Sequence, residues 1–448
     1  MKASKAKKGW GLIMVLIAFL LILPYPAALK AADVPSVADV IKGKKGKADL
    51  DLPTIEDLTG GKVKIGDLID KSNVDLVKEY LSPAIYGSVE QGLVLRMSTG
   101  LPYDQMVPKY FMDITERNRG KAVMDETGTV YYEKMGILWP GGVPFPEPNT
   151  GLEVMANTKF GLIWDEFRNY PIKMFLVDSK GRRYKSVGQE HRYIKFTGRT
   201  KIPPLGAIPG YENLHFKRLV VLNSPLELKG LGQYSVRYYD DSRFYDTGFA
   251  YLPAFKRTIR VSATTWQDNV AGSDLTHQDG MGMQDPYSGW TFKLLESKYL
   301  LLTEPKSPFE IVDEKGKINE KMQFDVGRKF PRFGWSIWPV HVVEAIPKHK
   351  NIYAKKTLYV NAWPYFPSVG PCELADMYDQ QMKLWKFYTH INGRIHHVDG
   401  DPFAMIYGFL CYDLQADHMT QYWFHERVND FNYKPEDVSL KTLLEAGR

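Results

Sequence analysis

Residues 340–347 read VHVVEAIP, residues 355–361 read KKTLYVN and residues 384–388 read LWKFY. Valine, isoleucine, tyrosine and tryptophan favour strands, and Pro, Gly, Asn and Asp separate the three runs. The region from Pro339 to Tyr388 is therefore predicted to form an antiparallel meander. Both faces of its first strand are mostly apolar, so we expect both to be covered. A core layer could cover one face and a bound apolar ligand the other.

The remainder of the 448-residue chain alternates a few helical segments with about a dozen strand-like ones. Helices are predicted near Val74–Leu81 and over Thr150–Phe167, where apolar residues recur at helical spacing. The glycine- and acid-rich stretch Asp268–Gly289 is predicted to be a long surface loop. This pattern predicts an α+β fold with one large antiparallel sheet.

Residues 1–31 are predicted to be a secretory signal peptide that is cleaved after Ala31 or Ala32. Lysines precede an apolar run over Leu12–Leu23, and prolines and small residues follow it. An uncleaved membrane anchor is the alternative, but the run is short for a bilayer span of about 20 residues. The segment holds five of the lysines, so the net charge of +6 falls to about +1 (6 − 5) on cleavage. We therefore predict no nucleic-acid partner, and we expect residues 32–62 to form a flexible arm.

Cys372 and Cys411 are the two cysteines of the chain. A pair of cysteines in an exported protein is compatible with one disulfide. Two buried free thiols are the alternative.

A cluster of histidines and acids suggests metal chemistry at first sight. His390, His396 and His397 lie close in sequence to Asp399 and Asp401. They lack the fixed spacing of a known zinc motif and fall in a turn-rich segment. A solvated loop is therefore favoured over a metal site.

Asp274, Asp279 and Asp285 surround two glycines, which suggests a calcium loop. Their spacing does not match the ligand positions of an EF-hand. An ordinary acidic loop is the favoured interpretation, and no metal or cofactor is predicted.

Glu344 lies in an apolar setting, where burial would raise its pKa and suit a general acid. Pairing with a nearby Lys or Arg, such as Arg257 or Arg260, is the favoured alternative. No serine-nucleophile motif of the G-x-S-x-G kind is present. We therefore name no catalytic residue and expect no enzymatic activity.

Several short motifs recur in a fixed order along the chain and carry a family resemblance. They are Phe145-Pro146 ahead of a helix, residues 251–260 (YLPAFKRTIR), Asp274 with Asp279, residues 342–345 (VVEA), Tyr359 with Trp363, and Tyr378-Asp379 with Leu384-Trp385. In this set the chain resembles an uncharacterised family of bacterial exported proteins related to the outer-membrane lipoprotein-sorting (LolA-like) carriers. The resemblance covers roughly Val63 to Arg448.

The resemblance implies one domain over residues 63–448 with loop insertions, built as a LolA-like half-barrel. A large curved antiparallel sheet, an incomplete β-barrel, would have helices covering its concave side and would enclose an apolar cavity. The protein would be periplasmic and soluble. The chain departs from the sorting carriers in its greater length and in the aromatic stretch Phe330–Trp338.

A carrier of this kind needs apolar strand residues facing its ligand, although most such residues form ordinary core. The predicted ligand-binding residues are Tyr238, Tyr251, Trp290, Val342, Leu358, Val360, Trp385 and Phe387, with Arg257 and Arg260 receiving an anionic headgroup.

The favoured function is a non-catalytic periplasmic carrier or binding protein for a hydrophobic small molecule or lipid. The helix at Thr150–Phe167 and the N-terminal helices would form its lid. One alternative is an envelope interaction or assembly protein that docks on an outer-membrane or transporter partner through aromatics around Trp335–Trp338. A hydrolase or metal enzyme that uses His397 or Glu344 is the other alternative.

Overall fold

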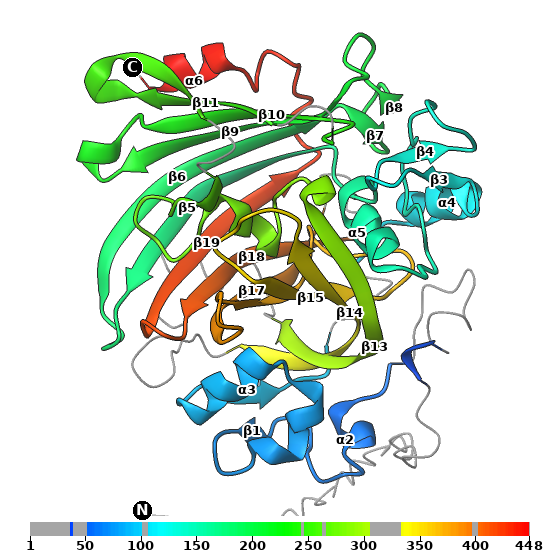
Figure 1. Cartoon of the computed structure of the whole chain (residues 1–448), viewed down its shortest axis with the longest axis vertical. Coiled ribbons are helices and arrows are strands. Elements are labelled where there is room, and N and C mark those ends of the chain that lie inside the picture. Colours follow the sequence, from blue (N-terminus) through cyan, green and yellow to red (C-terminus); the bar gives the residue numbers. More distant parts are fainter. Residues whose placement is uncertain are drawn as a thin grey trace, which may run out of the picture.

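One large open sheet dominates the computed structural model (Figure 1). The structure describes residues 36–38, 52–100, 106–242, 246–261, 266–304, 333–396 and 402–447. Within these ranges fifteen strands form a single sheet in the order β1-β2-β14-β15-β16-β17-β18-β19-β5-β6-β9-β10-β11-β12, with β13 paired to β14. Only β2 and β14 pair in parallel. The predicted α+β fold with a large, curved and unclosed antiparallel sheet is confirmed.

The strands of this sheet are β1 (Leu68–Ile69), β2 (Leu95–Met97), β5 (Glu166–Val177), β6 (Arg183–Lys195), β9 (Leu214–Ser224), β10 (Gly232–Tyr238), β11 (Thr247–Leu252), β12 (Arg257–Val261), β13 (Trp290–Glu304), β14 (Gly334–Pro347), β15 (Lys355–Asn361), β16 (Leu374–Tyr378), β17 (Leu384–His396), β18 (Pro402–Asp413) and β19 (His418–Val428). Two small hairpins pair β3 (Ala122–Met124) with β4 (Val130–Tyr132), and β7 (Thr197–Arg199) with β8 (Gly206–Ala207).

The α-helices are α2 (Ile55–Leu58), α3 (Pro83–Glu90), α4 (Lys109–Asn118), α5 (Gly151–Phe160) and α6 (Leu440–Ala446). The 3₁₀-helices are η2 (Val74–Tyr80), η4 (Leu226–Leu228), η5 (Pro253–Phe255), η7 (His277–Gly282) and η8 (Tyr287–Gly289). None of these described helices has the length and apolarity that a membrane span requires.

The predicted meander is confirmed as β14, β15, β16 and β17, which pair antiparallel in chain order. Protein covers both faces of it. Asp376 on β16 accepts a hydrogen bond from the Ser82 hydroxyl at 3.1 Å, at the start of α3. The adjacent Ala375 faces Gly282 of η7. Since neighbouring strand residues point to opposite faces, α3 lies on one side of the meander and η7 on the other.

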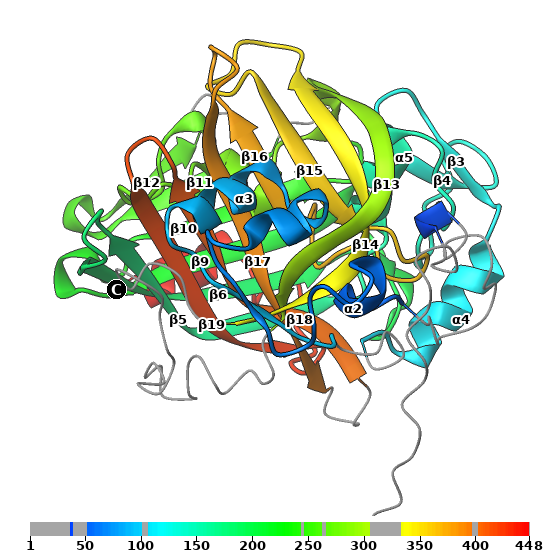
Figure 2. The same ribbon diagram turned by 90° about the horizontal axis from the view of Figure 1, so that it is seen from below.

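The N-terminal helices therefore pack on the outer face of the sheet and do not form a lid over its concave side. Figure 2 shows α3 lying across β15 and β16. Ser82 caps α3 by accepting a hydrogen bond from the Ile85 N–H, and Pro83 occupies its first turn. The segment expected as an arm is described only at 36–38 and 52–62, where Ile55 of α2 is buried in the main core.

The helix predicted over Thr150–Phe167 forms as α5 but ends at Phe160, because the chain from Glu166 onward joins β5. Thr150 and Glu153 make a capping box at its start. The hydroxyl groups of Thr158 on α5 and Tyr287 on η8 lie 2.8 Å apart. This contact places α5 on the concave side of the sheet.

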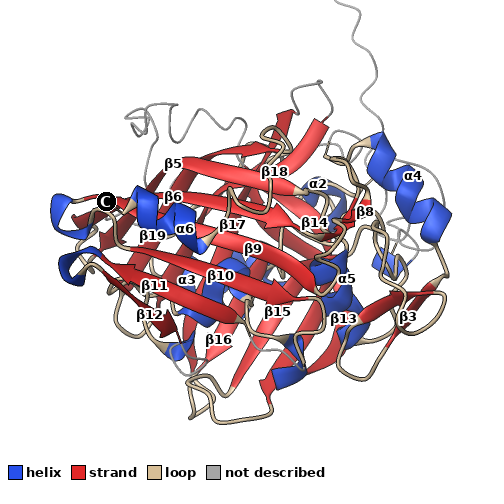
Figure 3. Cartoon of the chain, turned by 90° about the horizontal axis from the view of Figure 1, so that it is seen from above, coloured by secondary structure: helices blue, strands red, loops and turns tan. Residues whose placement is uncertain are grey.

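Helix α6 covers the opposite face of β9, β10 and β11 (Figure 3). Leu443 of α6 packs in one cluster with Leu219, Tyr234 and Tyr251. Leu219 and Arg218 are neighbours on β9, so the side chain of Arg218 points to the concave face instead.

Residues 266–289, which we call the inner loop, lie inside the curve of the sheet (Figure 1). The prediction of a surface loop here is wrong, since Thr276, Gln278, Asp279 and Met283 are all buried. Acids and glycines are typical of surface loops, but these acids find partners on the sheet. The inner loop is therefore part of the core.

The strongest of these contacts joins Asp279 to Lys356 of β15, at 2.9 Å with both side chains 0% exposed. The Tyr353 hydroxyl donates to the other carboxylate oxygen of Asp279 at 2.7 Å, and Lys356 also donates to the Gly282 carbonyl at 3.0 Å. Burial acts to raise the pKa of Asp279, but Lys356 and Lys386 outweigh it and hold that pKa below its usual value.

A second anchor lies at Asp274, whose backbone carbonyl accepts a hydrogen bond from Lys386 at 2.8 Å. The Asp274 carboxylate is 2.7 Å from Nδ1 of His418 and accepts a hydrogen bond from the Thr420 hydroxyl. Three sheet strands, β15, β17 and β19, thus hold the inner loop.

Cys372 and Cys411 are both buried and free. Cys372 packs against Gly282, where an added Cβ would lie 2.3 Å from its sulfur. Of the two alternatives left open by the sequence, the structure has the free thiols.

Replacing Lys356 by Met should lower the free energy of unfolding by about 3–5 kcal/mol, because it leaves the buried Asp279 carboxylate unpaired. Chemical denaturation measures the change. Lys109→Met is the matched control, since Lys109 pairs with Asp113 in an exposed contact on α4 and should matter little. Equal, small losses in both variants would contradict the structural role of the ion pair.

Asp376 gives a pH-dependent prediction. Burial raises its pKa to about 7 from a usual 3.8, so the folded protein holds a proton that the unfolded chain has lost. This contribution to stability is full below pH 3.8 and is lost as the pH rises to about 7.

Asp376→Asn should therefore show a free energy of unfolding that falls less steeply than the wild type between pH 4.5 and 7, by up to about 1.4 kcal/mol per pH unit. Denaturation series at several pH values measure both slopes. Asp113→Asn on the exposed face of α4 is the control. Parallel curves for wild type and Asp376→Asn would show that Asp376 does not titrate in this range.

Candidate functional site

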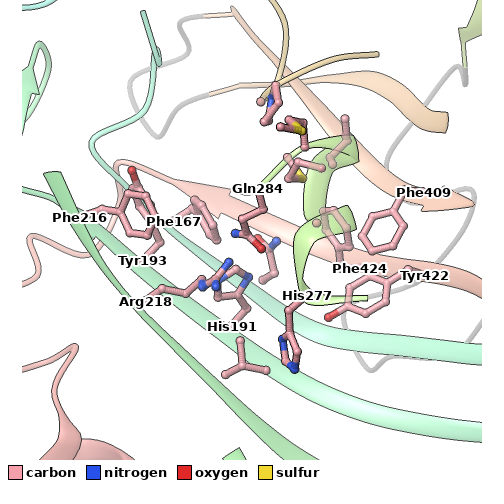
Figure 4. Close-up of a pocket in the computed structure, with 18 of the residues that line it drawn as sticks. Phe167, His191, Tyr193, Phe216, Arg218, His277, Gln284, Phe409, Tyr422 and Phe424 are labelled. Carbon is pink, nitrogen blue, oxygen red and sulfur yellow. The ribbon is translucent and has the colours of Figure 1, made fainter. Parts of the chain in front are cut away.

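A cavity of about 270 Å³ lies between the concave face of the sheet, α5 and the inner loop. Strands β5, β6, β9, β10, β18 and β19 form its floor. Six aromatic side chains dominate the wall in two groups, Phe167, Tyr193 and Phe216 at one end and Phe409, Tyr422 and Phe424 at the other (Figure 4). The cavity is therefore mainly apolar.

The register of the sheet places a row of polar side chains across this floor. Glu426 of β19 pairs with Asn169 of β5, which pairs with His191 of β6. His191 pairs with Val220 of β9, and Val220 with Gln233 of β10. All five residues line the cavity. A carboxyl, an amide and an imidazole group thus meet in one cross-strand row.

The next row, two residues along β6 and β9, pairs Tyr193 with Arg218. The side chains of His191, Arg218 and Tyr422 lie deep within the protein. Each still has some accessible surface, and that surface faces the cavity. Figure 4 shows Arg218 and His191 on the strand floor, with the amide of Gln284 approaching from the inner loop. His277 also comes from that loop.

Burial decides the charges of these groups. It lowers the pKa of His191 to about 3, with a further contribution from Arg218, so the imidazole is neutral at pH 7. It raises the pKa of Glu426 well above the usual value, although a hydrogen bond with Asn169 opposes the shift. Burial lowers the pKa of Arg218 only to about 10. Arg218 therefore remains a cation beside the neutral imidazole of His191. The other two cationic residues of the lining, Lys159 and Arg237, pair with Asp241 and Asp246.

Four buried polar atoms at the cavity have no hydrogen-bond partner among the described residues. They are Oδ1 of Asn169, Nε2 of His191, the hydroxyl of Tyr193 and Oε2 of Glu426. Nearly all buried polar groups in proteins are paired, so four unpaired atoms around one cavity mark a place of unmet hydrogen-bonding capacity. A ligand with a polar end would meet that capacity.

The structure places the predicted ligand-binding residues away from this cavity. Val342, Leu358, Val360 and Phe387 are buried in the main core, Trp290 donates from its indole to Asp285, Trp385 packs on Tyr353, and Tyr238 and Tyr251 join the cluster beneath α6. None of these eight is a lining residue. In the structure, the meander residues Val342, Leu358 and Trp385 pack against protein.

The predicted headgroup residues Arg257 and Arg260 lie exposed on the edge strand β12, remote from the lining of the cavity. Glu344 pairs with Lys355 at 3.0 Å, so its predicted pairing with a lysine or arginine is confirmed, although the partner is neither Arg257 nor Arg260. Arg218 was not identified from the sequence, because a lone arginine in a mixed strand has no distinctive spacing.

Trp335 and Trp338 are buried. The aromatics expected to dock on an envelope partner are therefore not available on the surface.

In the part of the chain that the structure describes, no group of three His, Cys, Asp or Glu side chains could hold a metal ion. Nδ1 of His390 lies 3.4 Å from Glu373. His397, Asp399 and Asp401 fall outside the described residues. All three acids of the supposed calcium loop are bound by protein groups. Asp274 and Asp279 have the partners described above, and Asp285 accepts a hydrogen bond from the Trp290 indole.

Comparison with solved structures found similar folds, three of which follow. A putative outer membrane lipoprotein-sorting protein domain from Vibrio parahaemolyticus is 16% identical with a TM-score of 0.42, covering 63% of this chain and 92% of its own. A DUF1329 family protein from Desulfovibrio piger is 14% identical with a TM-score of 0.42, covering 62% and 92%. A LolA superfamily protein from Nitrosomonas europaea is 10% identical with a TM-score of 0.37, covering 66% and 100%.

No curated protein matched the chain. The model of a family described as "Protein of unknown function (DUF1329)" matches residues 68–442, which is most of the sequence. The expectation of an uncharacterised family is confirmed, and this chain belongs to the DUF1329 family.

Proposed function

We propose that this protein binds and carries a small hydrophobic molecule in the bacterial cell envelope. The observation that carries the proposal is the aromatic-lined cavity between the sheet and the inner loop. Pockets for small molecules are typically concave, mostly apolar and supplied with a few polar groups that fix orientation. The export pattern of residues 1–31 supports the location.

The size of the cavity limits the ligand. An engineered cavity of about 150 Å³ holds one benzene molecule, so by the same ratio the cavity here holds roughly eleven non-hydrogen atoms. Its volume of about 270 Å³ suits a single medium-length chain or a small ring system. A lipid with several acyl chains does not fit inside it.

The energetics favour reversible binding. Ten methylene groups transferred from water contribute roughly 8 kcal/mol, and association costs about 4–15 kcal/mol. Apolar contact alone therefore gives weak binding, and polar contacts at the cavity floor would add affinity. Moderate, reversible affinity suits a carrier.

The chemistry of the floor also favours binding over catalysis. With its pKa lowered to about 3, His191 is a weak base at neutral pH. Tyr193 is far from ionisation, because burial raises its pKa. These groups are suited to hydrogen bonding in their neutral forms.

Filling the cavity should weaken binding of a small neutral fluorescent probe such as 1-aminonaphthalene, which matches the size of the cavity. Leu275→Trp adds a large ring at the cavity wall and should weaken probe binding at least tenfold in a fluorescence titration. Leu226→Trp makes the same change at an 83% exposed position and should leave binding unchanged.

Thermal unfolding of both variants shows whether the fold is kept. Undiminished probe binding by a folded Leu275→Trp variant, or no binding by the wild type, would sink the proposed cavity.

A further inference from the structure

We infer that the cavity takes an amphiphile with one anionic head group, which Arg218 binds while the aromatic wall holds the apolar part. The shared chemistry is a carboxylate or phosphate on a single chain of about ten carbons. This inference rests on the proposed function and names the ligand class of the same cavity.

Arg218 stands out as a cation without an acidic partner. Its Nε donates to the Ser235 hydroxyl at 3.2 Å, and none of the hydrogen bonds found between described residues uses Nη1 or Nη2. A guanidinium carries five N–H donors in a fixed planar fork. Four donors are therefore free to meet a ligand.

Nearby acids do not neutralise this charge. Asp246, which attracts Arg218 electrostatically, is already held by Arg237 through both oxygens, at 2.9 and 2.8 Å. Glu426, at the far end of the polar row, bonds to Asn169, and burial raises its pKa, which disfavours its charged form. A buried cation without a partner is costly, and an anionic ligand would remove that cost.

The groups around Arg218 suit an anionic head. The unpaired hydroxyl of Tyr193, directly across from Arg218 on β6, is a donor and is itself only 5% exposed. The neutral ring of His191 and the amide of Gln284 lie on either side of the guanidinium (Figure 4). Arginine binds carboxylate and phosphate in a bidentate manner, which also fixes orientation.

The apolar part of the ligand extends from Arg218 toward the other end of the cavity. Phe409, Tyr422 and Phe424 line the other end of the cavity (Figure 4). The Tyr422 hydroxyl is already satisfied, since it donates to Gln189 at 2.7 Å. This end offers ring faces, and the inner-loop methionines Met281 and Met283 also line the cavity, so the wall suits a hydrocarbon chain.

Four probes of equal chain length test the inference by displacement of the neutral fluorescent probe. They are decanoate, decyl phosphate, decanol and decyltrimethylammonium. The wild type should bind decanoate or decyl phosphate at least tenfold more tightly than decanol, and the cationic amphiphile more weakly than decanol. The tighter of the two anions identifies the head group.

Arg218→Met should weaken binding of the preferred anion at least tenfold and leave decanol unchanged. Arg260→Met, which removes an exposed cation on β12, is the matched control and should change neither. Tyr193→Phe removes only the unpaired hydroxyl and should weaken the anion several-fold. It provides a readout if Arg218→Met does not fold.

Equal binding of decanol and both anions by the wild type would overturn the inference while leaving the proposed carrier function intact. So would unchanged anion affinity in folded Arg218→Met or Tyr193→Phe. Failure of all four probes and of the neutral dye to bind would instead overturn the proposed function itself.

Discussion

The structure depends on one buried ion pair, between Asp279 of the inner loop and Lys356 of the meander. A fully buried ion pair is tolerated only when its geometry is good and further hydrogen bonds satisfy the charged groups. This ion pair meets both conditions. Tyr353 and Thr276 donate to Asp279, and Lys356 donates to the Gly282 carbonyl. By fixing η7 against β15, the pair turns an acidic, glycine-rich segment into an inner layer of the protein. That layer is the wall opposite the strand floor of the cavity.

The two halves of the sheet consequently have different roles. In β14 to β17 the inner loop covers one face and α3 the other, so apolar strand residues such as Leu358 pack on protein. In β9 and β10 the outer face carries α6, while the concave faces of β5, β6, β9 and β10 meet the cavity. There the strands alternate aromatic with polar residues, as His191 and Tyr193 show. Strands β14 to β17 are packed against protein on both faces, and the polar groups available to a ligand are concentrated in the half that contains β5, β6 and β9.

The sequence supported the large antiparallel sheet, the meander and the start of α5, because these follow from local spacing and residue type, whereas the open curve of the sheet was implied by the family resemblance. The predicted ligand-binding residues lie away from the cavity for a physical reason: the most apolar strands are those that protein covers on both sides. The cavity residues Asn169, His191 and Arg218 look like ordinary polar strand residues until the register brings them together. The burial of Asp279 was equally hidden, since its partner Lys356 lies far along the chain. The proposed role of Arg218 can be inferred only from its position in the three-dimensional structure.

The central claim is that the space enclosed by the inner loop holds one small amphiphile. Native mass spectrometry of the full protein, purified from the envelope of its own cells without detergent, tests this most directly. The account predicts a one-to-one complex whose added mass, after extraction, belongs to a single-chain hydrophobic acid. A protein that carries no such mass, and acquires none when decanoate or decyl phosphate is supplied, would contradict it.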